Sequence, residues 1–126
     1  MSIVLDASAV LAVLNGEAGG DKVSGHLSGG LLSAVNAVEV GTRLVDAGMT
    51  PDDASVATNL LGMTIVDFDA DLAAIATALR PATRKAGLSL ADRACLALAV
   101  REGLPALTAD QLWTSVDVGV EVEMIR

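Results

Sequence analysis

Short apolar segments alternate with helical patterns along the chain. The first covers residues 3–5, and others lie at residues 31–35, 63–66 and 105–108. Apolar segments this short, bounded by turn residues, are typical of strands that are buried in a parallel sheet. The stretches between them place apolar residues at the three- and four-residue spacing of amphipathic helices. The pattern therefore predicts strands that alternate with helices.

Polar residues mark where several of these helices are expected to start. Residues 36–39 and 89–92 each have the spacing of a capping box. Thr50 stands before Pro51, as an N-cap stands before a proline at the first helical position. Asp69 is expected to cap a further helix in the same way. Each signal places a helix directly after a turn or a predicted strand.

The remaining segments complete this arrangement. Residues 81–87 begin with a proline and end with a glycine, so we predict a loop there. Residues 118–125 alternate between apolar and polar positions and are expected to form a final edge strand. Strands separated by helices through tight connections indicate one domain, residues 1–126, built as a three-layer α/β/α sandwich on a mostly parallel sheet.

The composition is apolar for a domain of this kind. Hydrophobic residues make up 52% of the chain, and the mean hydropathy is +0.57. No apolar run reaches the roughly 18 residues that a membrane-spanning helix needs, and the start of the chain lacks a secretory signal pattern. We therefore expect a cytoplasmic protein without a membrane segment, whose surplus apolar surface is covered by a partner or a second copy.

Acidic residues dominate the charge. Sixteen acids face eight bases, which gives a formal net charge of −8. This balance disfavours broad electrostatic attraction to nucleic acid, but it suits a chain that groups several acids around a cation. His26 is the only histidine and Cys95 the only cysteine. The sequence therefore argues against histidine-based zinc sites and excludes an internal disulfide.

Four acids occupy one kind of position. Asp6 and Asp110 directly follow predicted strands, and Glu39 and Asp92 stand third in a helix after a predicted N-cap. Any one of them alone could be only a helix cap, which contributes about 0.5–2 kcal/mol. Because parallel strands bring their carboxyl ends to one edge of a sheet, we expect the four to meet there. Oxygen ligands without histidine or cysteine suit Mg²⁺ or Mn²⁺, which can activate a water to attack a phosphodiester.

The motifs around these acids resemble those of PIN-domain ribonucleases of the VapC toxin type. The matching segments are residues 4–8, 33–39, 88–93, and 107–110 with Trp113. The resemblance covers essentially the whole chain, and all four acids are present. It implies a metal-dependent endoribonuclease toxin of a type II toxin–antitoxin system, which hydrolyses RNA phosphodiester bonds with a metal-activated water.

The resemblance also implies roles for individual residues and partners. It implies that the protein acts as a homodimer, and that a cognate antitoxin holds it inactive by packing over the toxin and blocking its site. The implied cofactor is Mg²⁺ or Mn²⁺, and the implied substrate is RNA. The metal-binding and catalytic residues would be Asp6, Glu39, Asp92 and Asp110, with Ser8 and Thr108 supporting the site by hydrogen bonding.

Basic residues gather in and beside the predicted loop before Asp92. Half of the eight bases lie there: Arg80, Arg84, Lys85 and Arg93. One interpretation is that they bind phosphates on either side of the cut, which would let an acidic protein handle RNA. The other is that they form a solvated loop and helix end.

Two other kinds of function remain as alternatives. A receiver-type signalling domain shares the length, the layering and acids at strand ends. Such a domain needs a phospho-accepting aspartate in mid-chain, for which Asp67 is a candidate, and a lysine after its last strands. The only lysines are Lys22 and Lys85, and neither stands there. A catalytically inactive PIN-fold binding module is the other alternative, and the four intact acids argue against it.

Overall fold

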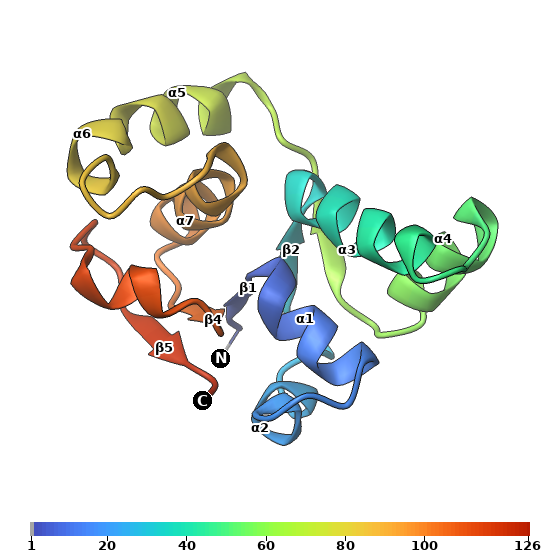
Figure 1. The fold of residues 1–126 in the computed structure, drawn as a ribbon. Coiled ribbons are helices and arrows are strands. Elements are labelled where there is room, and N and C mark those ends of the chain that lie inside the picture. Colours follow the sequence, from blue (N-terminus) through green and yellow to red (C-terminus); the bar gives the residue numbers. More distant parts are fainter. Residues whose placement is uncertain (1) are drawn as a thin grey trace.

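A computed structural model describes residues 2–126 and contains the parallel sheet that the sequence predicts (Figure 1). Every neighbouring pair of strands is parallel, and the strand order is β3-β2-β1-β4-β5. The first strand therefore lies at the centre of the sheet, and the last lies at an edge as expected. The strands are β1 (Val4–Leu5), β2 (Leu31–Ser33), β3 (Thr64–Val66), β4 (Ala106–Thr108) and β5 (Val122–Met124).

Helices connect these strands. Among residues 2–126, none is long and apolar enough to cross a membrane. A short 3₁₀ helix, η1, follows β4. The bounds are α1 (Ala7–Leu14), α2 (Gly20–Ser24), α3 (Ala34–Asp46), α4 (Pro51–Asn59), α5 (Ala70–Ala78), α6 (Arg80–Thr83), α7 (Leu90–Glu102) and η1 (Gln111–Ser115).

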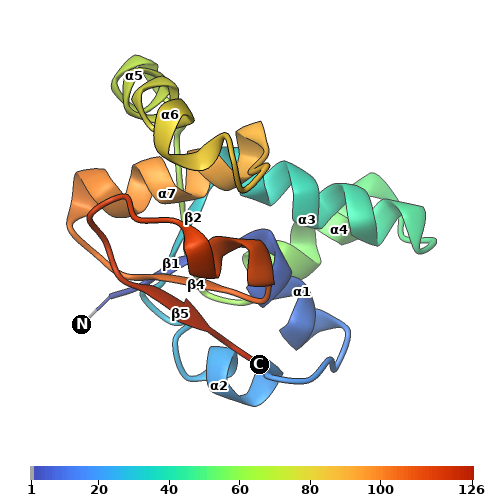
Figure 2. The same cartoon turned by 60° about the vertical axis from the view of Figure 1, so that its left-hand side comes forward.

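Helices pack on both sides of the sheet, with α1 and α3 on one side and α7 on the other (Figures 1 and 2). The side chains of β1 alternate between the two apolar layers. Leu5 packs with Val10 of α1 and Val40 of α3 on one face of the sheet. Val4 packs on the other face, in a second cluster that includes Leu96 of α7 and the fully buried Trp113. Successive residues of a strand point to opposite faces, so β1 must be apolar throughout. The predicted α/β/α sandwich is confirmed.

One predicted helix start is wrong. Helix α3 begins at Ala34, directly after β2, because the Ser33 hydroxyl oxygen accepts a hydrogen bond from the Val35 N–H at 3.3 Å. Asn36 and Glu39 therefore do not form a capping box and instead lie within the helix. Ser33 supplies a cap before Asn36 could, so the expected strand of residues 31–35 is also shorter.

The other predicted helix caps are confirmed, whereas the predicted loop and the last strand need correction. The capping box of residues 89–92 is present, and Thr50 and Asp69 each accept an N-cap hydrogen bond. The predicted loop at residues 81–87 is partly wrong, because α6 includes Pro81 in its first turn, where a proline ring is tolerated. The final strand is also shorter than the predicted 118–125.

This topology defines the edge where a site can form. The carboxyl ends of β1, β2 and β4 lie together because these strands are adjacent and parallel. From these three ends the chain continues into α1, α3 and η1. Ligands of open parallel sheets bind at such an edge, where neighbouring connections diverge.

Candidate active site

A cavity of about 580 Å³ opens at this edge of the sheet, and all four predicted acids line it. Asp6 comes from the end of β1, and Asp110 from just beyond the end of β4. Glu39 comes from α3 and Asp92 from the first turn of α7. The expected convergence of four chain segments is therefore present in the structure.

Asp6 is the most deeply placed of the four, with 4% of its surface exposed. Its Oδ2 accepts hydrogen bonds from the Ser8 hydroxyl at 2.7 Å and the Thr108 hydroxyl at 2.9 Å. The Ser8 oxygen accepts from the Ala109 N–H at 2.9 Å, and the Thr108 oxygen accepts from the Asp110 N–H at 3.0 Å. These bonds use each hydroxyl as both donor and acceptor, so the carboxylate is fixed to the backbone after β4.

Asp6 occupies the N-cap position of α1, yet its side chain makes no cap hydrogen bond. The pKa of Asp6 is raised to about 6, chiefly by burial. The Ser8 and Thr108 hydroxyl bonds offset part of this increase, and the negative charges of Asp92 and Glu39 add to it. Helix capping therefore does not account for this aspartate. Its environment disfavours the charged form unless a cation lies nearby.

Glu39 is held in a different way. Its Oε1 accepts a hydrogen bond from the Asn36 side-chain amide at 2.9 Å, one helical turn earlier. The same amide nitrogen donates to the backbone oxygen of Ala91 at 3.1 Å. This contact was not predicted, because residues 36–39 were interpreted as a capping box.

Asp92 and Asp110 are helix caps as well as cavity residues. The Asp92 Oδ2 accepts the Ser89 N–H at 2.8 Å, and the Asp92 N–H donates to the Ser89 hydroxyl at 3.1 Å. The Asp110 Oδ1 accepts the Leu112 N–H at 3.0 Å at the start of η1. Capping and a place in the cavity are therefore compatible, because each carboxylate has two oxygens.

The four acids share one pattern of hydrogen bonding. Each carboxylate commits one oxygen to a hydrogen bond that fixes its side chain. The other oxygen accepts no hydrogen bond from any residue in 2–126, so it remains free to bind a ligand in the cavity. The committed oxygens are Asp6 Oδ2, Glu39 Oε1, Asp92 Oδ2 and Asp110 Oδ1.

Comparison with known proteins assigns this arrangement to a family. The family model described as the PIN domain matches residues 3–119. The chain belongs to the PIN domain family. No curated protein sequence matches it.

Solved structures that share this PIN fold include bacterial toxin–antitoxin complexes. The DNA-bound VapBC complex of Salmonella typhimurium has a TM-score of 0.76 at 15% identity, over 100% of this chain and 99% of the other. A toxin–antitoxin complex from Klebsiella pneumoniae has a TM-score of 0.76 at 17% identity, over 98% of each chain. VapBC2 of Rickettsia felis, bound to a DNA fragment from its promoter, has a TM-score of 0.73 at 16% identity, over 98% of each chain. At these identities the likeness shows a shared fold.

The PIN topology also separates this chain from receiver domains. Asp67 follows β3, which lies at the outer edge of the sheet, with β2 between it and β1. It does not line the cavity that contains Asp6. A phospho-accepting role for Asp67 beside Asp6 therefore finds no support in the fold.

The donor set of the PIN cavity fits a hard divalent cation. Its ligands are carboxylate oxygens, and its walls carry five acids against the two arginines Arg43 and Arg126. No three histidine, cysteine or acidic side chains of residues 2–126 lie close enough together to hold one ion by themselves. Mg²⁺ usually keeps several waters and takes only one or two carboxylates. The cavity therefore suits an ion that is bound partly through water.

The basic residues singled out from the sequence lie elsewhere. None of them lines the cavity: Arg80, Arg84 and Lys85 are exposed, and the Arg93 guanidinium donates to the Ala76 backbone oxygen at 3.0 Å. RNA binding by these four residues stays a prediction.

The two cavity arginines were not predicted as RNA-binding residues. Arg126 donates to the Ala18 backbone oxygen and lies 3.9 Å from Glu17. Within residues 2–126, Arg43 makes no ion pair with Glu39, although the two lie one helical turn apart on α3. Its position one helical turn after Glu39 could have indicated from the sequence that Arg43 lines the same cavity.

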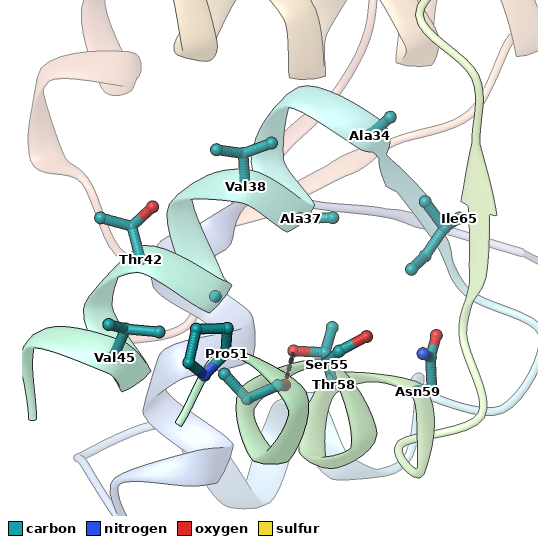
Figure 3. A pocket seen from close by; sticks show the side chains of 12 residues that line it. Ala34, Ala37, Val38, Thr42, Val45, Pro51, Ser55, Thr58, Asn59 and Ile65 are labelled. Carbon is teal, nitrogen blue, oxygen red and sulfur yellow. Dashed lines mark hydrogen bonds between the residues drawn. The ribbon is translucent and has the colours of Figure 1, made fainter. Parts of the chain in front are cut away.

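A second, more apolar cavity of about 470 Å³ adjoins the first (Figure 3). It is a groove between α3 and α4, with Val45 on one wall, Ala54 on the other and Ile65 of β3 at one end. Val38 and Thr42 line both cavities, so the groove opens onto the acids. Val38 is 67% exposed, although it is apolar. This α3/α4 groove is part of the exposed apolar surface that the composition predicted.

Proposed function

We propose that this PIN domain is a metal-dependent endoribonuclease that acts as a toxin in the cytoplasm. The observation that supports this most strongly is that the two oxygens of each carboxylate differ in their hydrogen bonding. One oxygen of each carboxylate is fixed by the fold, and the other is free in a shared cavity. A purely structural role would not require four free oxygens at the carboxyl edge of the sheet.

Mg²⁺ or Mn²⁺ is the cofactor that this donor set suits, and when bound it would hold a phosphate oxygen and lower the pKa of a water. The residues of the chain would bind the cation and hold its ligands in fixed orientations. Ser8 and Thr108 keep Asp6 in one position, and the capping bonds of Asp92 and Asp110 do the same for those side chains. Fixed ligands need no rearrangement during the reaction, which is a source of rate enhancement in itself.

The products of cleavage test the proposed reaction. Attack by water on a phosphodiester leaves a linear phosphate end, whereas attack by the neighbouring 2′-hydroxyl leaves a 2′,3′-cyclic phosphate. We expect purified protein with Mg²⁺ or Mn²⁺ to give only linear phosphate ends on a single-stranded RNA, as measured by mass spectrometry. A substrate with a single 2′-deoxy sugar at the cleaved nucleotide should still be cut there. Cyclic phosphate ends, or loss of cleavage at the deoxy sugar, would exclude a water nucleophile.

We also propose that an antitoxin holds the protein inactive from the α3/α4 groove. The structurally similar complexes from Salmonella typhimurium, Klebsiella pneumoniae and Rickettsia felis are toxin–antitoxin assemblies. In this chain the groove is apolar and leads into a cavity where acids outnumber bases. A peptide with an apolar segment followed by a basic residue complements both regions. Such a peptide would cover the free carboxylate oxygens.

A charge placed in the groove should release the toxin. We expect Val45→Glu to weaken binding of the small protein encoded by a neighbouring reading frame by on the order of 10²-fold, because a carboxylate buried without a partner costs several kcal/mol. RNA cleavage should be unchanged, since Val45 does not line the acid cavity. Leu60→Glu is the matched control, because Leu60 is 79% exposed and lies outside the groove. Equal binding of the antitoxin by the two variants would show that it binds outside the groove. Light scattering of the complex would separately test whether the toxin is a homodimer.

A further inference from the structure

Asn36 is a buried amide that helix formation does not require. Its side chain is 0% exposed, in the first turn of α3. Ser33 already caps this helix, so Asn36 has no capping role. Asparagine is a poor residue within a helix, because its side chain competes with the backbone for hydrogen bonds. Its presence must therefore be explained by contacts outside the helix backbone.

Those contacts join Glu39 to the helix turn that carries Asp92. The Asn36 Nδ2 donates to Glu39 Oε1 at 2.9 Å and to the Ala91 backbone oxygen at 3.1 Å. Glu39 lies on the same helix, whereas Ala91 lies on α7 and directly precedes Asp92. One amide group thus links the Glu39 carboxylate to the chain segment that carries Asp92.

The side-chain oxygen of Asn36 shows that stability alone does not explain this residue. Asn36 Oδ1 is buried and has no hydrogen-bond partner among residues 2–126. A buried polar atom without a partner costs free energy, whereas an apolar side chain of similar shape avoids that cost. Leucine has nearly the same shape as asparagine and is a better helix former. The fold therefore retains Asn36 despite a cost, and its two donated bonds are what leucine could not supply.

We propose that Asn36 is a positioning residue that sets the spacing between Glu39 and Asp92 in the acid cavity. It holds one oxygen of Glu39 against the first turn of α7, which carries Asp92. The spacing matters because the four acids are not close enough for three of them to hold an ion directly. This inference rests on the proposed function, since it concerns the same metal site.

The test is the affinity of the purified protein for Mn²⁺ alone, without RNA. We expect Asn36→Leu to weaken Mn²⁺ binding by about 10–100-fold, as measured by electron paramagnetic resonance of the free ion, because loss of a group that orients a metal ligand has effects of this size. The urea midpoint of unfolding in EDTA should change little, because the two lost hydrogen bonds and the removed unsatisfied oxygen act in opposite directions. In cleavage assays, more Mn²⁺ should be needed for half the maximal rate, and saturating Mn²⁺ should restore part of that rate.

Two further variants sharpen the result. Asn36→Thr keeps one hydroxyl donor and should fall between wild type and Asn36→Leu. Thr83→Val is the matched control, because Thr83 is also 0% exposed and its hydroxyl donates to the Leu79 backbone oxygen, away from the cavity. It should bind Mn²⁺ as wild type does, even if its unfolding midpoint falls.

The outcomes separate the inference from the function on which it rests. If wild type binds Mn²⁺ and cuts RNA while Asn36→Leu binds equally well, the positioning role is wrong and the proposed function stands. If Asn36→Leu does not fold, Asn36→Thr decides in the same way. If wild type neither binds Mn²⁺ nor cuts RNA, the proposed function fails and the positioning role fails with it.

Discussion

Replacing Asp6 by asparagine is expected to stop RNA cleavage and to leave the protein folded. Asparagine keeps one side-chain oxygen, which can still accept the hydroxyl bonds of Ser8 and Thr108 that Asp6 Oδ2 accepts now. The free oxygen is replaced by an amide nitrogen, which cannot bind a cation. We expect the rate to fall on the order of 10³-fold, because metal catalysis contributes several kcal/mol and each 1.36 kcal/mol is a factor of ten. A gel assay on a short RNA measures this.

The same variant should be more stable than wild type at neutral pH in EDTA. Folding raises the pKa of Asp6 to about 6 from an ordinary value of 3.8, so the folded protein binds this proton more tightly than the unfolded chain. The resulting stability is fully present below pH 3.8 and is lost as the pH rises through about 6. Asparagine stays neutral throughout, so Asp6→Asn should exceed wild type by on the order of 2–3 kcal/mol at pH 8. Urea unfolding at pH 4 and pH 8 measures the difference.

A second aspartate gives a matched control for this prediction. Asp69 caps α5 by accepting the Leu72 N–H and pairs with Arg101 at 3.2 Å, and it does not line the acid cavity. The Leu72 bond, followed by the charge of Arg101, holds the pKa of Asp69 below its ordinary value. Asp69→Asn should therefore leave cleavage intact and should not stabilise the protein as the pH rises. Active Asp6→Asn protein, or an Asp6→Asn variant that is less stable than wild type at pH 8, would contradict the assignment of Asp6.

The fold could be predicted from the sequence because its signals are local. Each strand is a short apolar run, and caps such as Ser89, Thr50 and Asp69 identify their helices by side-chain chemistry alone. The predicted start of α3 was wrong because two candidate caps stand only three positions apart. Ser33 and Asn36 are both good N-cap residues, and only the end of β2 decides that Ser33 is used.

The site was predictable in its acids and not in its supporting contacts. The four carboxylates stand where the chain leaves a strand or starts a helix, and parallel strands bring such positions together. The contact of Asn36 with Ala91 spans 55 residues, and that of Thr108 with Asp6 spans 102. No periodicity or local motif contains such contacts. The resemblance to PIN ribonucleases pointed to Thr108, whereas nothing in the sequence pointed to a positioning role for Asn36.

Two interpretations of these acids, capping and catalysis, turn out not to compete. Asp92 and Asp110 each accept a capping bond with one oxygen, and both side chains line the cavity. Asp6 stands at an N-cap position without a cap bond. A cap bond restricts the rotamer of an aspartate, so it also fixes the direction of the second oxygen. The same side chain can therefore stabilise the start of a helix and, under the proposed function, orient a metal ligand.

Removing divalent metal is expected to abolish cleavage, and adding Mg²⁺ or Mn²⁺ should restore it. A short RNA without secondary structure should be used, so that EDTA acts on the protein and not on the folding of its substrate. Added Mn²⁺ should also raise the urea midpoint of unfolding, because a ligand that binds only the folded state stabilises it. That increase should be larger at pH 8 than at pH 5, since Asp6, with a pKa of about 6, must lose its proton before it can bind a cation. Undiminished cleavage in EDTA, or an equal increase at both pH values in wild type and Asp6→Asn, would show that the cavity does not hold the metal through Asp6.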